Sequence, residues 1–330
     1  MSSLNLSEPS EPMYYRLRGA SPFAGTTLGA LLSWAAVTVL AAGYAYADLH
    51  IKVVDKLSIL ILIVFAVAMG FAVAGVLRVT KVRNLAVIAI IAATSAVLAL
   101  YVSWVVWESA FLQKIGEDVP AWELFTRPNA VWSLAQLFNE EGTFMLRDRP
   151  VKGTELWLAW GIEALSIVGC TLFIPLLTLR RMAFCESCGS WCEKRKNLAR
   201  VRALDEDLLR EHVENRDFGY LSRLGPPEEN ASVFHSIELF RCPKCGQTNL
   251  LTVNRVTVTY TNGQRAENAK PIVDRLWLNA AEAEVVLTLP QGMMEAAMTS
   301  SQMASSQQAG AAEANESATD PQSQPPATPV

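Results

Sequence analysis

Four long apolar runs follow one another along the N-terminal half of the chain, separated by segments that carry most of the local charge. The runs cover residues 27–47, 57–77, 84–107 and 156–179. At a rise of about 1.5 Å per residue, about 20 helical residues cross a hydrocarbon core of about 30 Å. The pattern therefore predicts an all-α, four-helix transmembrane bundle over residues 27–179, with a far-side loop at 108–155. Because the first run follows a polar segment, residues 1–26, and is too long for a typical signal peptide, we expect it to remain as an anchor.

Lysine and arginine gather on one side of the predicted bundle. They precede the first run, fill the turn between the second and third, and follow the fourth, whereas loop 108–155 is acid-leaning. Such an excess marks the cytoplasmic side of membrane proteins. The charges predict a multi-pass membrane protein, in contact with the lipid bilayer and with both termini cytoplasmic. The basic residues are Arg16, Arg18, Arg78, Lys81, Arg83, Arg180, Arg181, Lys194, Arg195 and Lys196.

The far-side loop contains an amphipathic pattern between Pro128 and Gly142. Proline favours the first turn of a helix and glycine its end, so the segment predicts a helix of about three turns. Two interpretations remain open: the helix packs on the bundle as a lid, or Trp132 anchors it in the headgroup layer.

Small residues recur at four-residue spacing in the second run, at Ala66, Gly70 and Ala74. This spacing lets two helix backbones approach closely, and it favours a compact bundle.

Glu163 is the one acidic or basic residue within the four apolar runs. Such a residue inside a membrane is costly and often functional. It is either a proton or cation site, or a carboxyl group that bonds a hydroxyl or backbone group of another helix. The second interpretation is favoured, because a coupled transporter usually has more polar residues at depth.

Six cysteines follow a pattern that points to a metal. Cys170 lies in the fourth run, while CESC and CPKC place two CxxC pairs in one soluble segment. Cytoplasmic thiols are kept reduced, and two such pairs supply four thiolates to one ion. Gly189 and Gly246 follow the pairs and tolerate the positive φ of a tight turn. We predict a tetrahedral zinc site formed by Cys185, Cys188, Cys242 and Cys245.

The knuckle sequence CPKCG resembles those of zinc ribbons and rubredoxins, and the resemblance implies a metal-site geometry. The whole chain resembles bacterial multi-pass membrane proteins with a cytosolic four-cysteine domain of the zinc-ribbon or rubredoxin-like kind, a likeness that implies no activity. The chain departs from a simple ribbon, because the two knuckles enclose a long insertion.

Alternatives remain for the metal and its ligands. Iron also suits four thiolates. Cys192 either replaces one ligand or stays free, and His235 is a remote substitute. A thioredoxin-like role for CESC is less favoured, because that motif belongs in a βαβ context.

The segment 180–290 predicts a small α+β domain that resembles a zinc ribbon with a helical insertion. The insertion LDEDLLREHVENRDFGYLSRLG has helical periodicity, whereas FHSIELFRC and NLLTVNRVTVTYTNGQ indicate strands. Asn279 and Glu282 form a capping-box pattern for a closing helix. The tail, residues 291–330, is poor in large apolar residues and is predicted to be disordered.

Two functional classes are not favoured by the sequence. The basic run CEKRKNLARVR is followed at once by acidic residues, so nucleic-acid binding is not expected, and contact with anionic lipid is the simpler account. The chain has no recognised catalytic motif, and a closed four-cysteine site leaves no open metal position, so we do not expect an enzyme.

Three hypotheses follow. The first is a membrane anchor that presents a cytosolic structural zinc module to a protein partner, as an adaptor or scaffold. The second is a small transporter or channel with Glu163 on its path. The third is a membrane-anchored, rubredoxin-like redox protein.

Overall fold

The computed structural model describes residues 13–17, 19, 21–50, 55–146, 149–228, 230–261 and 264–289. The chain divides into two compact units. One is Leu17–Met182, and the other combines Met1–Arg16 with Ala183–Val330. The tail predicted to be disordered, residues 291–330, lies outside the described residues.

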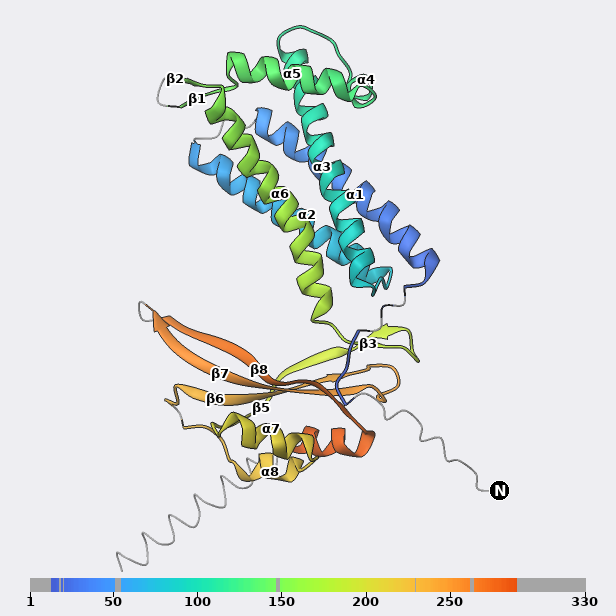
Figure 1. The fold of residues 1–330 in the computed structure, drawn as a ribbon, viewed down its shortest axis with the longest axis vertical. Helices are drawn as coiled ribbons and strands as arrows, with labels where there is room; N and C mark the ends of the chain where they lie inside the picture. The colour runs from blue at the N-terminus through green and yellow to red at the C-terminus, as the bar shows by residue number, and fades with distance from the viewer. Residues whose placement is uncertain are drawn as a thin grey trace, which may run out of the picture. The chain divides into compact units, whose positions relative to one another are not determined.

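Four long helices dominate the first unit (Figure 1). They are long and apolar enough to cross a membrane, as the apolar runs predict. Polar residues mark where such helices begin: Asn84 caps α3 by accepting hydrogen bonds from the N–H groups of Ala86 and Val87. The four helices are α1 (Phe23–His50), α2 (Asp55–Val79), α3 (Leu85–Lys114) and α6 (Thr154–Arg180).

All four of these helices continue beyond the apolar runs. Helix α1 extends past Asp48, and α3 extends past Glu108. The predicted runs end at the first charged residue, but a helix satisfies its own backbone hydrogen bonds and does not have to stop there. The assignment of Glu108 to the far-side loop is therefore wrong, since this residue is on α3 and its side chain is fully buried.

The small residues of α2 pack against α6. A Cβ atom added at Gly70 would lie 2.5 Å from the carbonyl oxygen of Cys170 and 2.7 Å from Cδ1 of Ile174. Ala66 and Ala74 are also buried. The close helix approach predicted from this spacing is confirmed.

A small cap follows α3 in the chain and covers part of its C-terminal end. The predicted amphipathic helix is confirmed as α5, which starts at Pro128 and is followed by Gly142 at a φ of 89°. Val131 of α5 packs in a cluster with Val105 of α3, so α5 is a lid on the helices. Trp132 stays exposed beside Trp157, with ring centroids 5.4 Å apart. The cap elements are α4 (Ala121–Phe125), α5 (Pro128–Glu141), β1 (Phe144–Leu146) and β2 (Arg149–Val151).

The second unit is a small antiparallel sheet with helices on one face (Figure 1). Its strand order is β5-β6-β7-β8, and each strand is antiparallel to its neighbour. Apolar residues of the sheet and of the helices share one core, which includes Val213, Leu221, Ile237 and Val253. The elements are β5 (Glu193–Arg202), α7 (Glu206–Glu214), α8 (Phe218–Arg223), β6 (Val233–Arg241), β7 (Asn249–Thr261), β8 (Gln264–Leu278) and a helix at 280–289.

Most of the predicted elements of this unit are confirmed. The insertion forms two helices, because Arg216 adopts a φ of 64° between them. The N–H of Asn279 donates to the carboxylate of Glu282, and the N–H of Glu282 donates to the Asn279 side chain, both at 2.8 Å. The capping box is therefore present. Strand β5 was not predicted, because its run of charged residues hides the alternation that marks a strand.

Candidate metal centre

Two short hairpin-like turns carry the paired cysteines. The first pair is held by β3 (Phe184–Cys185) and β4 (Ser190–Trp191), with Cys185 opposite Ser190. The second pair follows β6 directly, and the N–H of Gly246 donates to the carbonyl of Cys242 at 3.1 Å. The positive φ values predicted for the glycines are confirmed, at 58° for Gly189 and 64° for Gly246. These turns bring the two cysteines of each pair to one side of the backbone.

The four predicted ligands converge. The sulfur atoms of Cys185, Cys188, Cys242 and Cys245 all lie within 4.8 Å of one another, and those of Cys185 and Cys245 are 3.7 Å apart. A tetrahedral ion with metal–sulfur bonds of about 2.3 Å needs sulfur–sulfur separations of about 3.8 Å. The arrangement therefore fits a four-thiolate metal ion.

Hydrogen-bond donors around the sulfurs favour the thiolate form of two cysteines. Burial raises the pKa of the Cys242 thiol, but the N–H of Cys245 and the Ser190 hydroxyl outweigh it and lower the pKa to about 6. For Cys185, hydrogen bonds from the Ser187 hydroxyl and other donors likewise exceed the effect of burial and lower the pKa. A lower thiol pKa makes metal binding easier, because the thiolate is the ligand.

The serines next to the cysteines contact the sulfurs of the candidate site, and the sequence reasoning missed them. Ser187 Oγ lies 3.1 Å from the Cys185 sulfur, and Ser190 Oγ lies 3.6 Å from the Cys242 sulfur. Their signal in the sequence is weak, since serine is common in any turn. Only the folded hairpin shows that Ser190 reaches across to the second knuckle.

The two residues proposed as substitute ligands, Cys192 and His235, do not join the group of four cysteines. Cys192 is buried close by, and burial, followed by the charge of Cys242, raises the pKa of its thiol to about 12. His235 lies on β6, where its Nε2 atom accepts a hydrogen bond from the N–H of Leu204 at 2.9 Å. Neither belongs to the cluster of mutually close sulfurs that the described residues contain.

His235 makes the second unit sensitive to acid. Burial lowers the pKa of its imidazole, and the charge of Arg255 lowers it further, so the fold favours the neutral ring. The resulting stabilisation is present above the ordinary pKa of about 6.5 and is lost as the pH falls through the lower folded-state value. We expect the His235→Gln variant, which keeps an acceptor without titrating, to lose less stability than wild type between pH 7 and pH 5. Thermal unfolding at both pH values measures this, and equal losses would contradict it, because acid-induced release of a bound metal is common to both chains.

Glu163 bonds a hydroxyl group of another helix. Its Oε1 atom accepts a hydrogen bond of 2.8 Å from the Tyr44 hydroxyl on α1. The structure thus provides the kind of partner that the favoured interpretation requires.

Glu108 is a second acid that the sequence reasoning did not single out. Both of its carboxylate oxygens are buried and have no hydrogen-bond partner among the described residues. It lies one helical turn after Val105, on the side of α3 that packs against α4 and α5. The helices of the bundle therefore bury an acidic side chain that lies outside the predicted apolar runs.

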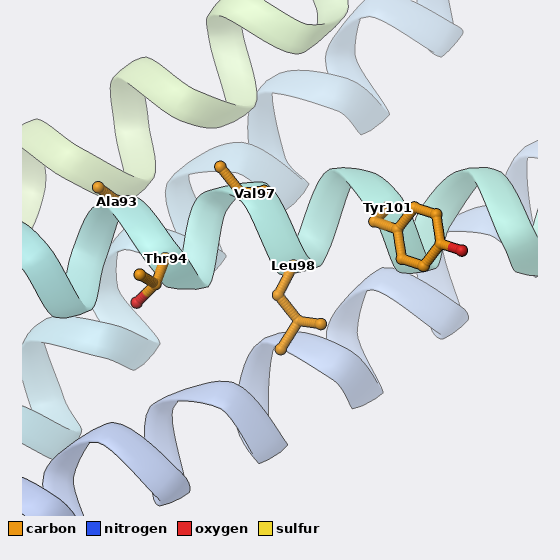
Figure 2. A pocket seen from close by; sticks show the side chains of 5 residues that line it. All are labelled: Ala93, Thr94, Val97, Leu98 and Tyr101. Carbon is orange, nitrogen blue, oxygen red and sulfur yellow. The ribbon is translucent and has the colours of Figure 1, made fainter. Parts of the chain in front are cut away.

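A groove of about 420 Å³ on α3 carries little chemistry (Figure 2). Its lining is almost entirely apolar, and Leu98 points from it toward α1. The hydroxyl of Thr94 accepts from Trp34, and that of Tyr101 donates to the carbonyl of Phe125. The groove offers no free ionisable group for catalysis or ligand selection among the residues that line it.

The basic run on β5 is partly neutralised. Lys194 forms a 2.6 Å ion pair with Glu238, and Arg200 lies 3.5 Å from Glu267. Arg200 also covers the ring of Phe234. Because these side chains are engaged within the unit, β5 presents less positive charge than its sequence suggests, and a strongly basic face is what phosphate binding needs.

Comparisons with known proteins assign no family to this chain. It matches no protein-family model, and no curated protein and no solved structure shows significant similarity to it.

Proposed function

We propose that the protein is a bacterial inner-membrane protein whose four-helix bundle anchors a cytosolic zinc-binding module, and that this module binds a protein partner as an adaptor or scaffold. The observation that carries the proposal is the convergence of four cysteine sulfurs within 4.8 Å in a unit attached to four membrane-length helices. Cys185, Cys188, Cys242 and Cys245 hold the ion, and its role is structural, because four protein ligands leave no open position.

An antiparallel contact joins the segment before α1 to the unit that follows α6. This contact supports placing both on one side of the membrane. Tyr14, which precedes α1, forms a bridge with Leu276, which follows α6. Residues that pair in one sheet must share a compartment, so an even number of crossings lies between them. Four crossing helices satisfy this condition, and the distribution of lysine and arginine favours the cytoplasm.

Zinc is proposed over iron because it is redox-inert and suits a closed structural site. Metal analysis of the full chain in detergent, together with its absorbance spectrum, tests this. We expect about one zinc ion per chain and no visible colour. A coloured, iron-containing sample would favour the rubredoxin-like redox alternative, and a metal-free sample would refute the proposal.

The adaptor role needs its own test. Affinity capture with the full chain compares wild type with a Cys185→Ser/Cys242→Ser variant. We expect a specific partner that only the wild type captures. Capture of the same proteins by both chains would show that the metal module does not form the binding surface.

A path for protons or small cations is a second candidate, favoured by Glu163 together with the buried carboxyl group of Glu108, which has no hydrogen-bond partner in the part of the chain that the structure describes. If the bundle is such a path, Glu163→Gln reduces ion flux into liposomes by about tenfold or more. Glu155→Gln is the control, because Glu155 is on the same helix but exposed and paired with Arg149. Absence of flux in the wild type would refute this candidate and leave the adaptor function in place.

A further inference from the structure

The N-terminal segment, defined as Met13–Arg16, adds a short strand to the exposed edge of β8. The N–H of Tyr15 donates to the carbonyl of Arg275 at 2.9 Å, and the N–H of Trp277 donates to the carbonyl of Met13 at 3.1 Å. These bonds flank the Tyr14–Leu276 bridge. A segment that precedes the first long helix is therefore built into the cysteine-containing unit.

The side chain of Tyr15 is fixed in this position. Its ring meets that of Trp277 edge to face, with centroids 5.7 Å apart, and the guanidinium of Arg275 covers it at 5.7 Å. Tyr15 is only 7% exposed. Because the ring is held on two sides, the direction of its hydroxyl group is well defined.

The Tyr15 hydroxyl reaches the first cysteine knuckle. It accepts a 3.0 Å hydrogen bond from the N–H of Phe184, the residue directly before Cys185. The neighbouring carbonyl, that of Ala183, accepts from the N–H of Cys192 at 2.9 Å and ties the same strand to the far side of the hairpin. The backbone that carries Cys185 is thus held from the N-terminal segment on one side and from the hairpin on the other.

We propose that Tyr15 is a positioning residue of the metal centre and that the N-terminal segment holds the first knuckle ready to bind the ion. The inference rests on the proposed metal site. Outer partners that orient a ligand commonly change metal affinity by about 10- to 100-fold when they are removed. Tyr15 acts through the backbone of β3, so its effect on the metal should exceed its effect on the fold.

Phe184 follows α6 closely in the chain, and Tyr15 shortly precedes α1. One hydrogen bond therefore links the stretch that leads into the first long helix with the stretch that leaves the last one. Loss of the ion should loosen this link and free the N-terminal segment.

Adjacent tyrosines provide a matched pair of variants. Tyr15→Phe removes the hydroxyl that binds Phe184 and keeps the ring, whereas Tyr14→Phe removes a hydroxyl that bonds Glu214 on α7, away from the cysteines. The full zinc-loaded chain in detergent is mixed with an excess of a chromogenic zinc chelator. We expect Tyr15→Phe to release zinc about tenfold faster than wild type, and Tyr14→Phe to stay within about twofold.

Two further measurements separate positioning from general destabilisation. The cobalt-substituted Tyr15→Phe chain should keep the thiolate-to-cobalt absorption of wild type, which shows that the four ligands are unchanged. In wild type, chelation should accelerate trypsin cleavage after Arg16, an exposed residue of the N-terminal segment.

The possible results separate a failure of the proposed role of Tyr15 from a failure of the proposed metal site. Equal release rates for the two tyrosine variants, or cleavage after Arg16 that does not respond to chelation, would overturn the role of Tyr15 while leaving the metal site intact. A wild-type chain that binds neither zinc nor cobalt would instead refute the proposed metal site itself.

Discussion

Replacing Cys242 by serine is expected to reduce the bound metal from about one ion per chain to less than about a tenth of that. Cys242 is almost fully buried, and its thiol has the lowered pKa of a ready ligand. A serine hydroxyl at the same position does not ionise near neutral pH and is a poor ligand for zinc. The three remaining thiolates leave the ion exposed to water and competing ligands, so affinity falls by orders of magnitude. Elemental analysis of the purified full chain measures the result.

Cys192→Ser is the matched control for this experiment. Cys192 is buried in the same region but lies outside the group of four sulfurs. We expect this variant to retain about one ion per chain. Loss of the metal from Cys192→Ser, with retention in Cys242→Ser, would exchange the roles of these two residues and contradict the assigned ligand set.

The second large effect is expected in the bundle, where Gly70→Ala should lower the stability of the first unit by about 2–3 kcal/mol. The added methyl group would lie 2.5 Å from the backbone carbonyl oxygen of Cys170. A backbone atom cannot rotate away as a flexible side chain does, so α2 and α6 have to separate. Thermal denaturation in detergent, followed by the loss of the monodisperse peak in size-exclusion chromatography, measures the change.

Gly75→Ala tests whether the effect depends on position. Gly75 is on the same helix, but apart from its chain neighbours and the adjacent backbone of α2, no atom of the described residues lies within 4 Å of a Cβ atom added there. We expect a change within about 0.5 kcal/mol. Similar destabilisation by the two variants would show that glycine is needed for helix flexibility and not for the contact with α6.

The candidate ligands could be named from the sequence because metal chemistry imposes local spacing. Two residues between paired cysteines, with a glycine after each pair, describe a turn whatever the rest of the fold. The structure brings the pairs together as expected. By contrast, the serines that bond the sulfurs, at 187 and 190, have no distinctive spacing, and their role depends on how the hairpin β3–β4 faces the second pair.

The elements of the fold likewise fall into those that local sequence signals predicted and those that they did not. Long apolar runs and a capping box are local signals, and the corresponding helices are present. Strand β5 escaped prediction because its pairing with β6 and the ion pairs of its lysine and arginine side chains join residues 32 or more positions apart. Glu108 escaped for a related reason, since its burial is decided by packing and not by its neighbours in the chain.

The sequence by itself determined the four membrane-length helices, the two cysteine pairs and the glycines that shape their turns. These features follow from helix length, hydrophobicity and backbone geometry, which act over a few residues. Only the tertiary structure decided which helices touch at Gly70, that Tyr44 bonds Glu163, and that Tyr15 reaches the knuckle strand at Phe184. Each of these contacts joins residues separated by 100 positions or more along the chain. Packing of the whole fold brings these residues together, and no local pattern in the sequence indicates such contacts.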